Sequence, residues 1–346
     1  MKKIIWVLLS VVALFSCKQG KVYYQESGSV FHTLYKIKYQ SDELLTDKID
    51  KELQEFNLSL NPFNPNSILA KVNRNENVEV DQWFTDVFNK AMIVAEQSDG
   101  AFDVTAAPFI NLWGFGFERK DSVSVQVIDS MKAFVGYQKI RLEGNRVIKD
   151  DPRTLLNFSA IAKGYACDVI AALLEREGVE NYMVDIGGEV VVKGMNPNGR
   201  CWQIAIDKPT DRQTIEDEYQ AVDKSDDKQT VNNKYQAIVP LCKPCGMATS
   251  GNYRNFYVKD GKKYAHTIDP RTGYPSEQNI LSATVVTSDC MTADAYATAF
   301  MAMGLDDALK LTAKLPEIEY YFIYTDSANQ IQIEMSEGIK QMIESR

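Results

Sequence analysis

The sequence predicts an α+β fold, and two observations support this prediction. Segments with the period of a helix and segments with the period of a strand follow one another without strict alternation, whereas a doubly wound parallel sheet requires alternation. Hydrophobic residues make up 45% and charged residues 25% of the 346 residues. That composition is enough for a large core and excludes a disordered chain. We therefore expect mixed or antiparallel sheets with packed helices.

A strand and a helix are expected first. Residues 31–39 alternate apolar with more polar side chains, which is the period of a half-buried strand. Apolar side chains at positions 45, 49, 53 and 56 are then spaced three to four apart, which predicts a helix. Ser41 can cap this helix, and the Asn-Pro turns of 61–65 end it.

Further helices and strands follow from the same patterns. Helical spacing covers 84–97, 165–177 and the alanine-rich stretch that begins at 292 and ends near Gly304. Strand-like segments are 182–192, 202–207, 281–287 and 318–324. The stretch from Pro209 to Tyr235 is polar and nearly free of large aliphatic side chains, so we expect a surface insertion there. Without internal repeats or boundary signals, residues 18–346 are expected to form a single domain.

The first residues predict export. Two lysines precede an apolar run at 4–15 that is short for a membrane span, as in a secretory signal. The run ends in Leu14-Phe15-Ser16-Cys17, which resembles a bacterial lipobox. Residues 1–17 are thus expected to be a lipoprotein signal peptide, with Cys17 lipidated and the mature domain anchored to a bacterial membrane and facing the periplasm. An uncleaved anchor helix and a plain signal peptide are the alternatives.

Charge and cysteine content exclude two classes of function. The net charge is -9, and Lys and Arg do not cluster as a nucleic-acid groove requires. Cys242-Lys243-Pro244-Cys245 is a CxxC segment, but no second cysteine pair follows it, and His32 and His266 are the only histidines. These features argue against structural zinc. In an oxidising compartment we expect a local disulfide within the CxxC segment, with a redox role as the alternative.

Asp294 and Thr298 are spaced four apart in the alanine-rich helix, which places both oxygens on one face. A carboxylate and a hydroxyl are hard ligands that suit Mg²⁺ or Ca²⁺. The competing interpretation is that Asp294 complements the helix dipole while Thr298 bonds back to its own helix. Spacing alone leaves both interpretations open.

Three small-residue segments are candidate ligand-binding turns. Residues 157–165 run from a short apolar strand into a helix, whose free N–H groups can meet an anion beside Lys163. Residues 185–189 and 249–254 are glycine-containing loops at strand ends. Either loop could equally be an ordinary turn. Residues 266–275 also have the composition of a turn, and His266 is a natural general base, although it could equally be structural.

Taken together, these segments resemble the FAD:protein FMN transferases, the ApbE family, in the same order and over nearly the whole mature chain. The marks that carry the resemblance are residues 32–35, 59–67, 100–103, 111–116, 160–164, 185–188, 249–251, 266–275 and 294–298.

The resemblance implies an ApbE-like, T-fold-related architecture that binds FAD and Mg²⁺. It also implies transfer of FMN to a threonine or serine of an acceptor protein with release of AMP, the usual acceptors being membrane redox-pump subunits. The metal would be held by Asp294, Thr298 and the backbone carbonyl of Ala160, and His266 would be the catalytic base. The residues implied to contact the flavin nucleotide are Phe31, Phe63, Ala101, Phe102, Asp103, Asn157, Lys163 and His266.

Two positions depart from the family pattern. Asn157 stands where the family commonly has aspartate, and Phe31-His32 replace a common Met-Gly. Neither departure removes a metal ligand, so activity is still expected. One alternative function is a periplasmic Mg²⁺-dependent FAD pyrophosphatase. Another is a non-catalytic flavin-binding lipoprotein or a surface interaction module that uses the polar insertion.

Overall fold

The computed structural model describes residues 21–115, 123–209, 235–252, 256–259, 262–265, 267–276 and 278–345. The predictions on Cys17, His266 and positions 210–234 of the insertion therefore lie outside the described residues.

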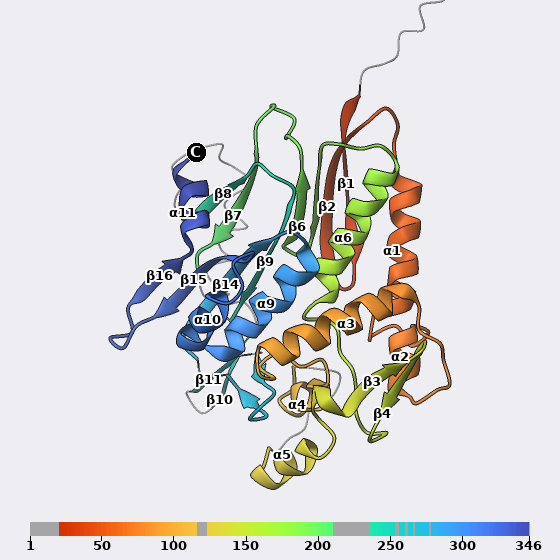
Figure 1. Ribbon diagram of the computed structural model, residues 1–346, viewed down its shortest axis with the longest axis vertical. Coiled ribbons are helices and arrows are strands. Elements are labelled where there is room, and N and C mark those ends of the chain that lie inside the picture. The colour runs from red at the N-terminus through yellow and green to blue at the C-terminus, as the bar shows by residue number, and fades with distance from the viewer. Residues whose placement is uncertain are drawn as a thin grey trace, which may run out of the picture.

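An eight-stranded sheet with the order β1-β2-β5-β6-β9-β14-β15-β16 forms the centre of the molecule (Figure 1). Its neighbouring strands pair antiparallel. The fold class was therefore correctly predicted. The strands are β1 Val22–Val30, β2 Thr33–Ser41, β5 Tyr182–Ile186, β6 Glu189–Lys193, β9 Cys245–Gly251, β14 Ile280–Thr287, β15 Glu319–Thr325 and β16 Ile331–Met335.

Strands β1 and β2 form a hairpin whose two-residue turn is Phe31-His32. Both residues are left-handed, with φ of 52° and 60°, as the right-handed twist of the flanking strands favours. The predicted strand start at 31 was therefore two residues early, because alternation of apolar residues does not reveal a turn. The Phe31 ring lies 5.4 Å from that of Phe56, and the His32 ring lies 5.2 Å from that of Phe63.

Helices cover one face of the sheet and enclose the larger core (Figure 1). Ser41 was wrongly predicted as a helix cap, because it ends β2 and its Oγ accepts a hydrogen bond from the Glu43 amide (3.2 Å). Apolar Leu45 stands at the N-cap position instead. The predicted helix at 84–97 agrees closely with the structure, and Asp81 caps its first turn. The covering helices are α1 Thr46–Leu60, α3 Gln82–Gln97, α6 Ala162–Arg176 and α9 Cys290–Met303.

A second, smaller core lies on the opposite face of the sheet under the hairpin of β7 (Trp202–Asp207) and β8 (Tyr235–Leu241) and under α11 (Glu337–Glu344). The segment 182–192, predicted as one strand, is the hairpin β5–β6. Gly187 and Gly188 form its turn, with φ of 71° and 100° that other residues rarely adopt.

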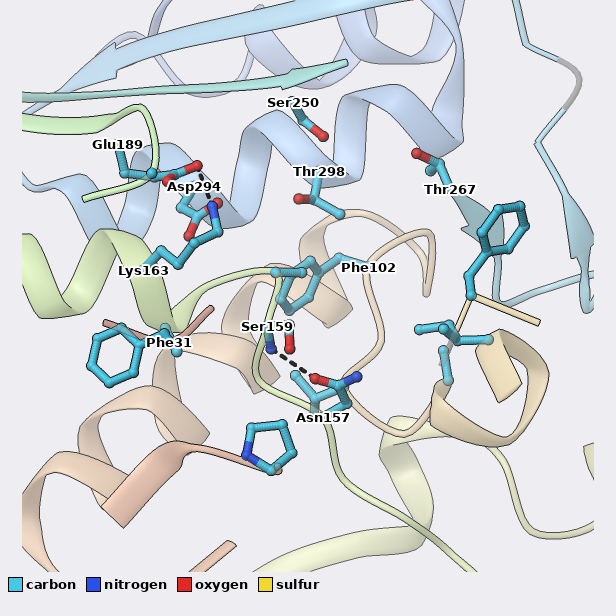
Figure 2. A pocket seen from close by; sticks show the side chains of 18 of the residues that line it. Phe31, Phe102, Asn157, Ser159, Lys163, Glu189, Ser250, Thr267, Asp294 and Thr298 are labelled. Carbon is cyan, nitrogen blue, oxygen red and sulfur yellow. Dashed lines mark hydrogen bonds and ion pairs between the residues drawn. The ribbon is translucent and has the colours of Figure 1, made fainter. Parts of the chain in front are cut away.

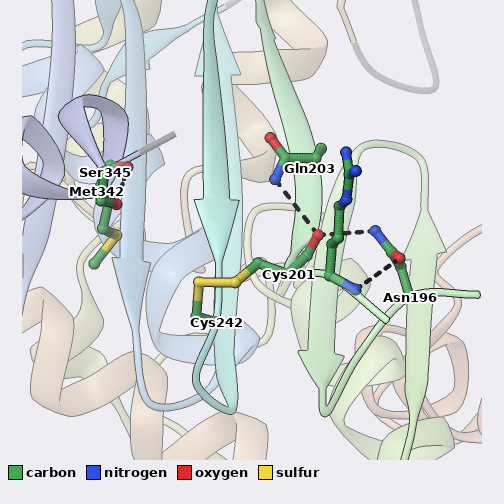
Figure 3. Close-up of a disulfide and its surroundings, with 7 residues drawn as sticks. Asn196, Cys201, Gln203, Cys242, Met342 and Ser345 are labelled. Carbon is green, nitrogen blue, oxygen red and sulfur yellow. Dashed lines mark hydrogen bonds between the residues drawn. A yellow bond between two sulfur atoms is a disulfide. The ribbon is translucent and has the colours of Figure 1, made fainter. Parts of the chain in front are cut away.

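The disulfide joins Cys201 to Cys242 (Figure 3). The expected bridge within the CxxC segment was wrong, and Cys245 keeps a free thiol. Strand register explains the observed pairing, because Cys201 directly precedes β7, Cys242 directly follows β8, and their neighbours Trp202 and Leu241 are cross-strand partners.

Smaller elements complete the description: α2 Ile68–Asn73, α4 Ala107–Leu112, α5 Val125–Lys132, η1 Tyr137–Lys139, β3 Ile140–Glu143, β4 Arg146–Lys149, β10 Phe256–Lys259, β11 Lys262–Ala265, β12 Ile268–Asp269, β13 Tyr274–Pro275 and α10 Leu305–Thr312. In the part of the chain that the structure describes, no helix has the length and apolar character to cross a membrane.

Candidate functional site

A cavity of about 910 Å³ collects the predicted site residues that the structure describes (Figure 2). Its volume is near the upper end of the range of roughly 300–1,000 Å³ for small-molecule sites. The predicted residues that line it are Phe31, Phe63, Ala101, Phe102, Asp103, Asn157, Ala160, Lys163, Asp294 and Thr298.

The cavity lies where strands β6 and β9 of the sheet cease to pair. Strand β6 pairs with β9 only from Val190↔Met247 to Val192↔Cys245, whereas β9 stays paired with β14 as far as Gly251. Beyond Met247 the free side of β9 therefore faces the cavity, and residues 249–251 line it. Ser250 of β9 and Thr298 of α9 both line the cavity (Figure 2).

Helix α9 is fixed at its N-terminus by two carboxylates. Asp289 accepts a hydrogen bond from the Thr292 amide (2.8 Å), and Asp168 of α6 accepts from the amides of Cys290 (2.9 Å) and Met291 (2.8 Å). Burial raises the pKa of Asp168 to about 7, although these two amides act in the opposite direction. Asp168 thus ties the helix that carries Asp294 to α6.

Helices α6 and α9 approach closely at Gly164. A Cβ atom on Gly164 would lie 2.2 Å from the Cys290 carbonyl oxygen, so a larger residue would push the helices apart. The Gly164 amide donates to Asp294 Oδ2 (3.0 Å). In a continuous helix this amide would donate to the carbonyl of Ala160. Because the Gly164 amide donates to Asp294 instead, it leaves the Ala160 carbonyl available to a ligand.

The Asp294 carboxylate is 4% exposed. Burial raises its pKa, and the Lys163 ammonium acts in the opposite direction. Thr298 is half-buried one helical turn later and also lines the cavity. A carboxylate, a hydroxyl and a carbonyl oxygen together fit Mg²⁺. Among the described residues, no group of three His, Cys, Asp or Glu side chains could hold a metal.

Lys163 forms an ion pair with Glu189 of β6 (Figure 2). Burial lowers the pKa of Lys163, but the Asp294 and Glu189 carboxylates outweigh burial and raise it above its ordinary value. Glu189 is 3% exposed, and its Oε2 has no hydrogen-bond partner among the described residues. Sequence reasoning identified the loop 185–189 but assigned no role to Glu189. A charged residue directly after a Gly-Gly turn and before three valines was the available signal.

Aromatic side chains form the apolar wall of the cavity: Phe31, Phe56, Phe63, Phe102 and Phe115. Asp103 lies beside this wall, and its two carboxylate oxygens already accept protein hydrogen bonds. Oδ1 accepts from the amide and hydroxyl of Thr105 (2.7 Å each), and Oδ2 accepts from the Tyr137 amide (2.8 Å). Burial raises the pKa of Asp103. These bonds give Asp103 a role in shaping the cavity wall.

Asn157 fixes the segment that leads into α6. The Asn157 Oδ1 accepts from the Ser159 backbone amide (2.8 Å), and the Asn157 backbone amide donates to the Val104 carbonyl (2.7 Å). The expected apolar strand at this point was wrong, since residues 155–158 are irregular. A neutral asparagine can thus hold the turn that presents Ala160.

Within the turn predicted at 266–275, residues 270–273 form the turn between β12 and β13. Asp269 holds it through two contacts with the Arg271 side chain, Nε to Oδ1 and an Nη to Oδ2 (2.9 Å each). Thr267, the neighbour of His266, lines the cavity and donates to Asn252 Oδ1 (2.8 Å). The assignment of His266 as a base stays a prediction.

Comparison with known proteins identifies the family. The protein-family model described as "ApbE family" matches residues 31–322 of the sequence. The chain belongs to the ApbE family. Its similarity to curated relatives extends over most of their length. An FAD:protein FMN transferase of Vibrio cholerae is 34% identical over 309 residues, which cover 86% of each chain, and one of Haemophilus influenzae is 33% identical with 100% of both chains covered.

Solved structures of ApbE proteins share the fold. The flavin transferase ApbE from Vibrio cholerae has a TM-score of 0.78 at 33% identity, covering 93% of this chain and 99% of that one. The Pseudomonas stutzeri flavinyl transferase ApbE has a TM-score of 0.78 at 26% identity, covering 93% and 97%. The predictions of an ApbE-like fold and of an enzyme of this family are confirmed.

Proposed function

We propose that this ApbE protein is a Mg²⁺-dependent FAD:protein FMN transferase, which moves FMN from FAD to a threonine or serine hydroxyl of an acceptor protein and releases AMP. The proposal rests on one observation: Asp294, Thr298 and Ala160 line the same cavity, and aromatic side chains form one of its walls. Such a cavity offers hard oxygen ligands beside a surface on which a flavin or adenine ring can pack.

The reaction breaks the pyrophosphate of FAD. The acceptor oxygen forms a bond to the FMN phosphorus, and the bridging oxygen leaves with AMP. When bound, Mg²⁺ would neutralise charge on the phosphate oxygens. Asp294, Thr298 and the Ala160 carbonyl would hold it, and Lys163 places a second positive charge beside Asp294. We assign to His266 the removal of the proton from the acceptor hydroxyl.

FAD hydrolysis is the main competing function, since water in place of the acceptor hydroxyl would give FMN and AMP at the same site. A pure flavin-binding protein is less consistent with the structure, because it gains nothing from burying Asp294 and Glu189 together.

The location of the protein forms part of the proposal. The Leu14-Phe15-Ser16-Cys17 segment supports a lipid anchor at Cys17 and a periplasmic position. A membrane redox-pump subunit is the acceptor that we propose.

Product analysis tests the function. The domain without residues 1–17 is mixed with FAD, Mg²⁺ and a redox-pump subunit, and intact-protein mass spectrometry follows the acceptor. We expect an FMN adduct and one AMP for each adduct, both abolished by EDTA. FMN and AMP without an adduct would indicate the pyrophosphatase instead.

A further inference from the structure

Leu34 of β2 lies beside the cavity and is 75% exposed. Its carbonyl accepts a hydrogen bond from the amide of Gly187 (2.9 Å), and Gly187 lines the cavity. A single exposed leucine is common on protein surfaces, so its meaning depends on the surrounding residues.

The rim between Leu34 and the cavity consists of small residues. Gly187 and Gly188 are both exposed and line the cavity. A Cβ on Gly188 would meet no described atom within 4 Å. Ala205 of β7, also exposed, lines the cavity as well. Another polypeptide can therefore approach the cavity closely over this rim. We name the surface formed by Leu34, Lys36, Gly187, Gly188 and Ala205 the outer strip.

Two lysines of β2, Lys36 and Lys38, follow Leu34 along the strand. Lys36 and Lys38 point to the same side of the strand as Leu34, because side chains alternate along a strand. Lys36 is exposed, and neither lysine has an ion-pair partner within 4 Å in the described part of the chain. Asp185 is the cross-strand neighbour of Lys36 and attracts it without forming an ion pair, while its Oδ1 accepts from the Gly188 amide (3.0 Å). Two lysines without an ion pair, against the single carboxylate of Asp185, favour an acidic partner.

We propose that the outer strip binds the acceptor polypeptide as an extended segment with an apolar and an acidic residue close to the acceptor hydroxyl. This inference rests on the proposed function, since only transfer to a protein requires a polypeptide at the rim. The apolar residue would cover Leu34, and the acidic residue would meet Lys36. Lys36 is about 7 Å further along the strand at 3.3 Å per residue, so the two acceptor residues are about two positions apart.

Peptide labelling tests the outer strip. The probes are two pools of 15-residue peptides with a central threonine, one rich in Asp and Glu at the flanking positions and one rich in Lys and Arg. Leu34→Glu and the double variant Lys36→Glu/Lys38→Glu are compared with Ile331→Glu and Lys314→Glu. Ile331→Glu changes an exposed residue of the edge strand β16, and Lys314→Glu changes an exposed residue of the turn after α10. FMN adducts are counted by mass spectrometry, and FAD affinity is measured by flavin fluorescence.

We expect the wild-type protein to label the acidic pool at least tenfold faster than the basic pool. Leu34→Glu should slow labelling of the acidic pool about tenfold or more, and the lysine variant should reverse the order of the pools. Both variants should bind FAD as the controls do. Labelling by both variants at the control rates, or a parallel loss of FAD affinity, would overturn the assignment. Hydrolysis of FAD without labelling of either pool would overturn the transfer function together with it.

Discussion

Burial of the Asp294 carboxylate destabilises the fold unless a cation pairs with it. Lys163 supplies part of that charge in the described structure, and the proposed Mg²⁺ would supply more.

Asp294→Asn tests this balance. Asparagine keeps the size of the side chain and can still accept from the Gly164 amide, but it removes the charge that a metal needs. We expect Mg²⁺-dependent turnover to fall about a hundredfold or more. Because burial raises the pKa of Asp294, the neutral residue should not lower the midpoint of thermal unfolding in EDTA. Wild-type turnover at low Mg²⁺ would show that Asp294 is not a ligand.

His266→Ala separates binding from chemistry. If His266 takes the proton from the acceptor hydroxyl, the variant should bind FAD and Mg²⁺ as before, while single-turnover transfer slows roughly a hundredfold or more. FAD titration and transfer should be measured on one preparation. Full transfer at saturating FAD would remove His266 from the mechanism, and a loss of FAD affinity alone would indicate a structural role.

Residue spacing and the family resemblance together identified ten of the residues that line the cavity, but gave no role to Glu189. Asp294 and Thr298 share one helix, so their spacing fixes their relative position. The unpaired Oε2 of Glu189 depends on how β6 packs against α6, and no local pattern encodes that contact. Asp103 was predicted to contact the nucleotide, whereas its hydrogen bonds show that it also fixes the backbone at Thr105 and Tyr137.

At the scale of elements, strong periodicity predicted helices better than strand ends. Helix α3 was predicted to within two residues of its observed bounds, because its apolar face is continuous. The turn at Phe31-His32 was missed. The loop at 185–189 was predicted, but the segment 182–192 was still taken as one strand, since apolar residues continue on both sides of the glycines. The disulfide was missed because its pairing depends on the register of β7 and β8 rather than on distance along the sequence.

The Cys201–Cys242 bridge should stabilise the hairpin that contributes Ala205 and Asp207 to the cavity. It closes a loop with a sequence separation of 41, for which chain entropy predicts about 4 kcal/mol of stabilisation. The double variant Cys201→Ser/Cys242→Ser should lower the midpoint of thermal unfolding and weaken FAD binding. Cys245→Ser serves as a control. An unchanged midpoint in the double variant would show that the strands hold the hairpin without the bridge.

At the scale of the whole molecule, the cavity depends on both faces of the sheet. Phe56 and Phe102 belong to the larger core, whereas Ala205 and Asp207 come from the strand that covers the smaller core. Residues from position 31 to position 298 meet in one cavity, so the site requires the complete fold.

Cys17→Ala tests attachment of the whole molecule to the membrane. A lipobox cysteine carries the lipid, so the variant should lose labelling by a fatty-acid probe and should no longer be retained by the membrane as a processed lipoprotein. Labelling and membrane fractionation in the native host measure both effects. Unchanged attachment of the alanine variant would contradict the lipid anchor and favour an uncleaved helix.

The β1–β2 hairpin has a consequence for how far an acceptor must reach. Strand β1 begins at Val22, five residues after Cys17, while the Phe31 end of the hairpin lies at the cavity. Nine strand residues span about 30 Å. With a lipid at Cys17, β1 would act as a spacer between the bilayer and the cavity. With β1 along the membrane normal, an acceptor in the same membrane would then need its hydroxyl on a domain or loop that projects about 30 Å above the lipid surface.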